Sequence, residues 1–143
     1  MASDIVITSD STTDLSPELR ERYNISVAPL GITLGDKVYT DGVDITPDDI
    51  YAHHAKTGEL PKTTATNVGD CLDFFKKFTD EGKTVIHFTI SSDMSSTYNN
   101  ACIAASELEN VYVIDTKNLS TGGGLLVVAA AETVSYTHLT LPT

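Results

Sequence analysis

Three short β-branched runs, separated by stretches with helical patterns, constrain the fold of this chain most. The runs at residues 5–8 and 84–90 are rich in apolar and β-branched residues, which is typical of buried strands, and residues 111–114 are predicted to be a third strand. Helical patterns between such strands indicate right-handed βαβ crossovers. The chain is therefore predicted to be an α/β domain built on a parallel sheet with helices covering both faces.

Helix-start and helix-stop residues place the helices. Ser16 before Pro17, and Thr46 before Pro47, each combine an N-cap hydroxyl with a proline at the first helical position. Glycines after the apolar periods are expected to end helices. Five helices are predicted, over residues 16–23, 46–58, 67–82, 95–109 and 125–131.

The segments outside these elements carry turn signals. Residues 25–34 are predicted to be extended, with a hairpin turn at 34–37, and Pro61–Thr66 is predicted to be a loop. Gly122, Gly123 and Gly124 precede the last predicted helix and do not match a GxGxxG motif. We expect them to permit close helix packing, because glycine has no side chain.

The 143 residues are enough for about one domain, which we place at residues 4–132. Residues 134–143 lose the helical period, and they resemble translated sequencing-adapter read-through. This segment, which includes His138, is predicted to be a non-native tail. The intact gene is then expected to encode a second domain of similar size.

Charge and cysteine content exclude several classes of function. The formal net charge of −11 argues against binding to nucleic acid or to anionic membrane surfaces. No apolar run approaches the roughly 18 residues of a membrane span, and no secretory signal is visible, so a cytoplasmic protein is expected. Cys71 and Cys102 lack the spacing of a zinc site or a disulfide framework and are predicted to be buried thiols.

Segments rich in hydroxyl groups follow each predicted strand, and another one lies at residues 61–66. Because ligands of parallel α/β sheets bind beyond the carboxyl ends of the strands, we expect these segments to form a site. Hydroxyls and free N–H groups at helix starts suit an anion such as a carboxylate or a phosphate. The turn at Ser95 is the strongest candidate, because it opens a predicted helix. The alternative is that these residues only cap helices and form turns.

Carboxylates and imidazoles suggest other chemistry. Asp10, Asp14 and Asp115 lie after strands and can be arranged to hold a divalent metal, although Asp10 can equally fix its own loop. His87 is predicted to be a buried imidazole within a strand. His53 and His54 are adjacent in a helix, so they face different directions. The second functional hypothesis is a small metal-dependent phosphotransferase or hydrolase that uses Asp10 and the Ser95 turn. No GxSxG or GxxxxGK[ST] motif is present.

An ordered set of short motifs spans residues 4–131. It resembles the DegV family of fatty-acid-binding proteins. The chain departs from the family pattern at Ser96, where the family has glycine, and at Ala65-Thr66, where it has Gln-Pro. The matching segments are Ile7–Ser11 with Asp14-Leu15, Ile25–Leu30, Tyr39–Gly42, Pro61–Thr64, Ile90–Tyr98, and Val113–Thr116 with Gly122 and Gly124.

This resemblance implies a carrier and not an enzyme. Family members bind one long-chain fatty acid, bury its tail, and present it to a separate fatty-acid kinase that makes an acyl phosphate for phospholipid synthesis. By position, the hydroxyls that contact the carboxylate are those of Thr63 and Ser95, with Asp10, Thr64 and Ser96 in supporting positions. No cofactor is implied. The chain would be the N-terminal half of a two-domain protein whose second domain closes over the ligand.

Overall fold

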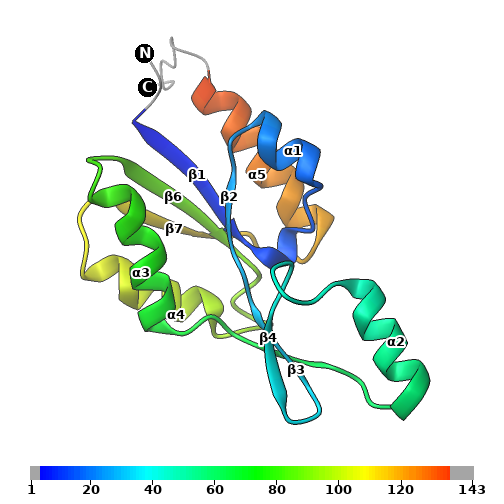
Figure 1. The fold of residues 1–143 in the computed structure, drawn as a ribbon. Helices are drawn as coiled ribbons and strands as arrows, with labels where there is room; N and C mark the ends of the chain where they lie inside the picture. Colours follow the sequence, from blue (N-terminus) through cyan, green and yellow to red (C-terminus); the bar gives the residue numbers. More distant parts are fainter. Residues whose placement is uncertain (1–3, 136–143) are drawn as a thin grey trace.

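The structure is a computed structural model, and it describes residues 4–135. Its centre is a four-stranded parallel sheet, the main sheet, with strand order β2-β1-β6-β7 (Figure 1). The predicted parallel α/β fold is confirmed. The strands of the main sheet are β1 (Ile5–Asp10), β2 (Ser26–Ala28), β6 (Thr84–Thr89) and β7 (Val111–Asp115).

Helices cover both faces of the main sheet, as Figure 1 shows. On one face lie α3 (Val68–Thr79) and α4 (Thr97–Ser106), and on the other lie α1 (Pro17–Arg22) and α5 (Thr121–Ser135), with the short 3₁₀ turn η1 (Ser11–Thr13) beside α5. Each layer has its own apolar cluster. The first cluster is centred on Cys71, Phe75, Val85, Ala101 and Ala104, and the second on Ile7, Ile25, Phe88, Val127 and Ala131.

A second, smaller unit projects from the main sheet. The antiparallel strands β3 (Gly31–Leu34), β4 (Lys37–Thr40) and β5 (Lys62–Thr64) form a small sheet with order β4-β3-β5, next to α2 (Pro47–Thr57). The predicted hairpin turn is confirmed, with Gly35 at φ 58°. The predicted loop over Pro61–Thr66 is partly wrong, because β5 lies within it. Its sequence, Lys-Thr-Thr, lacks an apolar alternation, and backbone pairing with β3 makes it a strand.

The helix starting at the glycines differs from the prediction. α5 begins at Thr121, so the glycines lie in its first turn and the expected start at Leu125 is wrong. A Cβ on Gly124 would lie 2.8 Å from the Thr13 carbonyl oxygen, so only glycine allows α5 to approach η1 this closely. The predicted packing role is therefore confirmed at Gly124. α5 continues to Ser135, and the rest of the predicted tail, with His138, lies outside the described residues.

Several smaller predictions can also be checked. α3 ends at Thr79, and Gly82 follows in a turn with φ 78°. Cys71 is buried, and its burial raises the pKa of the thiol to about 11. Cys102 is only half-buried, so that part of the prediction is wrong. Within residues 4–135, no helix is both long enough and apolar enough to cross a membrane.

Candidate functional site

The hydroxyl-rich segments that follow β1, β6 and β7 meet at the carboxyl edge of the main sheet, as predicted, whereas residues 62–64 belong to the small sheet. α4 and α5 follow β6 and β7 and begin at this edge, and α3 runs antiparallel to β6 and begins there too. The loops after β6 and β7 are bonded directly. The Ser91 N–H donates to the Asn118 carbonyl oxygen over 3.0 Å, and the Thr116 hydroxyl donates to the Thr89 carbonyl oxygen over 2.8 Å. Three helix starts therefore surround one polar edge.

Asp10 fixes the loops at this edge. Its Oδ1 accepts from the N–H and the hydroxyl of Thr12, and its Oδ2 accepts from the Ile90 N–H over 2.7 Å. Burial of the carboxyl raises its pKa. Both oxygens are thus occupied by protein donors, which supports the loop-fixing role over the metal hypothesis. No group of three or more His, Cys, Asp or Glu residues suited to a metal occurs in the described part of the chain.

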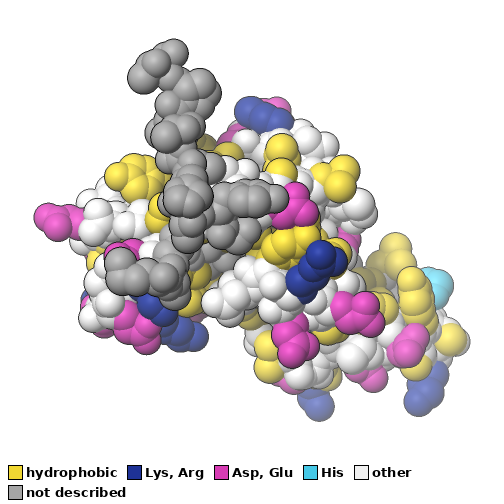
Figure 2. Space-filling model, turned by 90° about the horizontal axis from the view of Figure 1, so that it is seen from above, with side chains coloured by type: hydrophobic (Ala, Val, Ile, Leu, Met, Phe, Trp, Pro, Cys, Tyr) yellow, Lys and Arg dark blue, Asp and Glu magenta, His cyan; other side chains and the backbone are white. Residues whose placement is uncertain are grey.

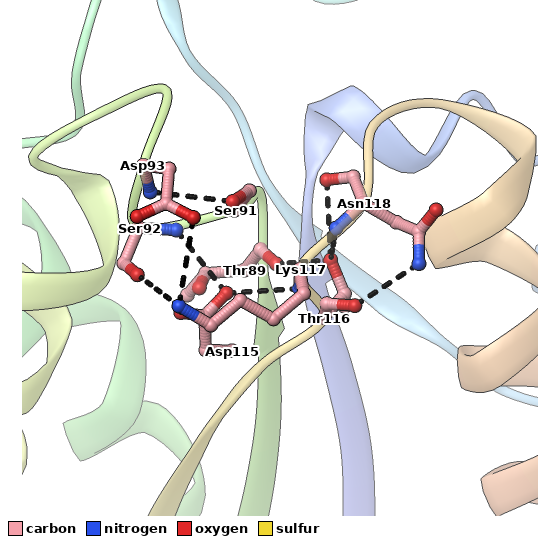
Figure 3. A network of polar contacts seen from close by, with 8 residues as sticks. All are labelled: Thr89, Ser91, Ser92, Asp93, Asp115, Thr116, Lys117 and Asn118. Carbon is pink, nitrogen blue, oxygen red and sulfur yellow. Dashed lines mark hydrogen bonds and ion pairs between the residues drawn. The ribbon is translucent and has the colours of Figure 1, made fainter.

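Asp115 locks the loop after β6 to the loop after β7 (Figure 3). Its Oδ1 accepts from the N–H groups of Ser92, over 3.1 Å, and Lys117, over 2.9 Å. The Lys117 ammonium lies 3.3 Å from the other oxygen and donates to the Ser92 hydroxyl over 3.1 Å. Burial would raise the pKa of this carboxyl, but the bonds from Ser92 and Lys117 outweigh it and lower the pKa to about 2. This network holds the turn before α4 firmly.

Ser95 lies in that turn, one residue before the N-cap Ser96, and caps the start of α4 in place of the Ser96 side chain, which makes no capping bond. Its Oγ accepts from the Thr97 N–H over 3.1 Å and is hydrogen-bonded to the Thr97 hydroxyl at 2.9 Å. The predicted capping role is therefore present. It does not exclude a ligand, because a hydroxyl oxygen can accept two hydrogen bonds while its proton donates a third. Ser96 is exposed and has φ −75°, so serine fits the family's glycine position without strain.

Thr63 and Thr64 lie on β5, at the edge of the small sheet. Thr63 is opposite Ile32 of β3, and Thr64 is opposite Gly31. Both threonine side chains are exposed, and neither hydroxyl is bonded to another residue of the described chain. These hydroxyls are therefore free to donate to a ligand.

One side-chain contact joins the segment that carries Thr63 to the helix that Ser95 caps. The Asn100 amide, in the first turn of α4, donates to the Thr66 carbonyl oxygen over 3.0 Å. No sequence motif marks Asn100, and Asn99 beside it is chemically identical, so only the structure distinguishes the half-buried Asn100 from the exposed Asn99.

His87 is not part of the polar edge. It is buried in β6, where its Nδ1 lies 2.8 Å from the Thr8 hydroxyl and its ring packs edge-on against Phe75. Burial lowers the pKa of the imidazole to about 3. The predicted buried imidazole is confirmed, and it remains neutral near pH 7. In α2, His54 is exposed and His53 lies 3.3 Å from Glu59.

A groove of about 380 Å³ lies between α3 and the small sheet. Neither Thr63 nor Ser95 lines it. Its walls include Pro29, Leu30, Val38, Tyr39, Phe74 and Lys77.

The fold and its polar edge define an open α/β domain whose candidate site consists of hydroxyls and helix-start N–H groups. The family described as "Uncharacterised protein, DegV family" matches residues 4–136. The chain belongs to the DegV family.

Curated relatives agree with this assignment. A DegV domain-containing protein of Clostridium perfringens is 39% identical over 132 residues, which is 91% of this chain and 47% of the relative. A DegV domain-containing 15.5 kDa protein of Staphylococcus aureus is 35% identical over 135 residues, 94% of this chain and 95% of that protein. The chain thus spans about half the length of the first relative and nearly all of the second.

Solved structures share the fold. A stearic-acid-binding protein from Eubacterium ventriosum has a TM-score of 0.83 and 34% identity, covering 90% of this chain and 46% of its own. A fatty-acid-binding DegV family protein from Thermus thermophilus has a TM-score of 0.86 and 31% identity, covering 94% and 49%. Both proteins bind fatty acid, and stearic acid is the one named for the Eubacterium ventriosum protein.

Proposed function

We propose that this chain binds a long-chain fatty acid and holds its carboxylate through the hydroxyls of Thr63 and Ser95. The observation that carries the proposal is the hydrogen bonding of the Ser95 hydroxyl. Its oxygen accepts from the Thr97 N–H at the start of α4, and its hydroxyl lies 2.9 Å from the Thr97 hydroxyl. When the Thr97 hydroxyl donates within this pair, the Ser95 proton can donate to an anion. The similarity to proteins described as fatty-acid-binding supports this ligand.

The electrostatics at the edge suit a carboxylate. α3 and α4 both begin there, and the partial positive charge of a helix N-terminus favours an anion. Thr64 and Ser96 flank the two main donors and are exposed. Asp10 supports the turn indirectly, because it accepts from the Ile90 N–H.

The same arrangement favours a carrier over an enzyme. Asp10 is occupied by its own loop and His87 is buried away from the edge, so neither is available as a general base. We propose that the bound acid is presented to a separate fatty-acid kinase. That kinase would form a bond between the carboxylate oxygen and the γ-phosphorus of ATP, releasing ADP. Because ATP is the phosphoryl donor, a cytoplasmic setting follows from this proposal.

The test is selective loss of acid binding. Ser95→Ala should weaken binding of a fatty acid about ten- to a hundred-fold, since a hydrogen bond to a charged group contributes roughly 1.5–3 kcal/mol. Binding of the fatty alcohol of equal length should weaken less. Displacement of a fluorescent fatty acid measures both, because the chain has no tryptophan to interfere.

Ser106→Ala, at the far end of α4, is the matched control and should leave both affinities unchanged. Thr63→Ala should behave like Ser95→Ala. The two should be non-additive, because both hydroxyls serve one carboxylate. Equal losses for acid and alcohol would mean that Ser95 is only a helix cap. Mass spectrometry of the purified chain should detect a bound monocarboxylic acid. If none co-purifies and none binds when it is added, fatty-acid binding is refuted.

A further inference from the structure

The two proposed carboxylate donors stand on different sheets. Ser95 precedes α4, which is packed on the main sheet, and Thr63 lies in β5 of the small sheet. In Figure 1 the green chain that contains β5 runs from α2 back to α3, between the two units. For both hydroxyls to donate to one carboxylate, their separation must be held by the chain that leads from β5 into α3, which packs on α4, together with contacts between these units.

The turn that carries Ser95 is held to the main sheet at several points. The Ile90 N–H bonds to Asp10, the Ser91 N–H to Asn118, and the Ser92 N–H to Asp115. Loss of any one of these bonds leaves the others in place. Ser95 is therefore well positioned by the main sheet alone.

The Thr63 segment, residues 62–66, is held differently. Its strand pairs with β3 of the small sheet only, with Thr63 opposite Ile32. Thr66 is 8% exposed, but its buried hydroxyl has no hydrogen-bond partner in residues 4–135, so it does not anchor the segment. Within that range, the bond from the Asn100 amide to the Thr66 carbonyl oxygen is the one hydrogen bond that joins this segment to α4.

Asn100 is well suited to set this separation. Its own backbone N–H donates to the Ser96 carbonyl oxygen over 2.9 Å, so it lies one helical turn beyond the Ser95 turn. Thr66 is three residues beyond Thr63, at most about 10 Å along an extended chain. The bond between Asn100 and Thr66 therefore lies a few residues from each of the two proposed donors, and it involves neither donor directly.

We propose that Asn100 is a positioning residue for fatty-acid binding, which holds the Thr63 segment against α4 so that Thr63 and Ser95 donate to the same carboxylate. This inference rests on the function proposed above. Binding sites need their donors held by supporting hydrogen bonds, because a loose donor loses much of its contribution.

The test removes the amide without adding charge. Asn100→Leu keeps the same number and branching of side-chain heavy atoms and has no donor, and Asn100→Ala is the smaller alternative if the larger leucine side chain does not fit. Either should weaken fatty-acid binding about tenfold, measured by displacement of a fluorescent fatty acid, and should affect the fatty alcohol less. Asn99→Ala, exposed in the same turn, is the matched control and should bind both ligands normally.

A double-mutant cycle distinguishes positioning from a general loss of stability. If Asn100 acts through Thr63, then Asn100→Ala should add little to the loss caused by Thr63→Ala. Hydrogen exchange should rise in residues 62–66 and stay unchanged in β6. If Thr63→Ala weakens acid binding and Asn100→Ala does not, the positioning role is wrong and the proposed function stands. Equal affinity of the unaltered chain for the fatty acid and the fatty alcohol would overturn both the proposed function and the positioning role of Asn100.

Discussion

The two sheets of this molecule are built in opposite ways. The main sheet is covered by helices on both faces and holds two apolar clusters with ten buried members. The small sheet has one cluster, whose buried members are Ile32, Leu34 and Ile45, and its helix α2 buries no residue completely. Tyr51 of α2 and Leu60 after it are exposed. Because burial of apolar side chains is the dominant stabilising term, we expect the main sheet to supply most of the stability.

The small unit also differs in its side-chain hydrogen bonds. In Figure 2 the lobe on the right shows acidic, basic, histidine and apolar side chains together on its surface. This lobe lies where Figure 1 places α2. Its hydrogen bonds are mainly local, such as the capping box between Thr46 and Asp49. A region of this kind opens locally more easily than a packed core. One of the two proposed carboxylate donors therefore belongs to the less stable region.

The largest effect is expected in the core of the main sheet. Phe75 is fully buried, and Phe75→Ala should lower the free energy of unfolding by about 3–5 kcal/mol. Urea unfolding followed by circular dichroism measures this, with Leu60→Ala as an exposed control within about 0.5 kcal/mol of the unaltered chain. If Ile32→Ala, in the small sheet, lowers the free energy of global unfolding as much as Phe75→Ala does, the main sheet is not the more stabilising of the two sheets.

Acid should destabilise the main sheet through His87. The folded-state pKa of about 3 lies below the unfolded value of about 6.5, so the unfolded chain binds the extra proton. The contribution of neutral His87 to the free energy of unfolding is therefore full above pH 6.5 and is lost as the pH falls toward 3. Between pH 6.5 and 4.5 the free energy of unfolding should fall by roughly 2–3 kcal/mol. His87→Gln, which does not titrate, should lose less over this range in urea titrations at each pH. His54→Gln, on α2, should follow the unaltered chain, and an unchanged slope in His87→Gln would contradict the prediction.

Two neighbouring glycines of α5 give a sharper contrast within the main unit. Gly124→Ala places a Cβ 2.8 Å from the Thr13 carbonyl oxygen and should cost about 1–3 kcal/mol. Gly123→Ala meets its neighbours at 3.5 Å or more and should be neutral or slightly stabilising, because alanine is the better helix former. Thermal unfolding of the pair measures the difference. Similar melting temperatures for both variants would show that α5 is not tightly packed on η1.

The smallest effect is expected in the small unit. Thr46→Ala removes the capping box of α2 and should cost about 1 kcal/mol of local stability. Hydrogen exchange should rise in α2 and remain unchanged in β1 and β6, because α2 lies outside the main sheet. Tyr51→Ala, exposed on the same helix, is the control. Faster exchange in β1 would mean that the two units unfold together.

Much of the main sheet could be predicted from local patterns. The runs that became β1 and β6 are rich in apolar and β-branched residues because these two central strands are largely buried, and consecutive residues show this directly. The run of β7 is equally apolar, but this edge strand leaves Tyr112 and Ile114 exposed. The helix starts at Ser16, Thr46 and Asn67 were equally visible, since capping depends on residues three positions apart. The polar edge followed from the rule that parallel strands end together.

The candidate site was only partly visible. Ser95 stood out because it precedes a predicted helix, whereas Thr63 was placed by family resemblance and its strand was missed. Lys62–Thr64 has no pattern of its own and becomes a strand through pairing with β3, some thirty residues earlier. Asn100 was missed because its partner Thr66 lies 34 residues away.

The sequence by itself determined the parallel α/β class, the positions of most helices, and the gathering of hydroxyls at one edge. These depend on burial and capping, which act between residues close together in the chain. The tertiary structure alone decided the separate small sheet, the close approach at Gly124, and the contact that joins the Thr63 segment to α4. Each of these requires residues distant in sequence to come within a few ångströms, and no local pattern records such a distance.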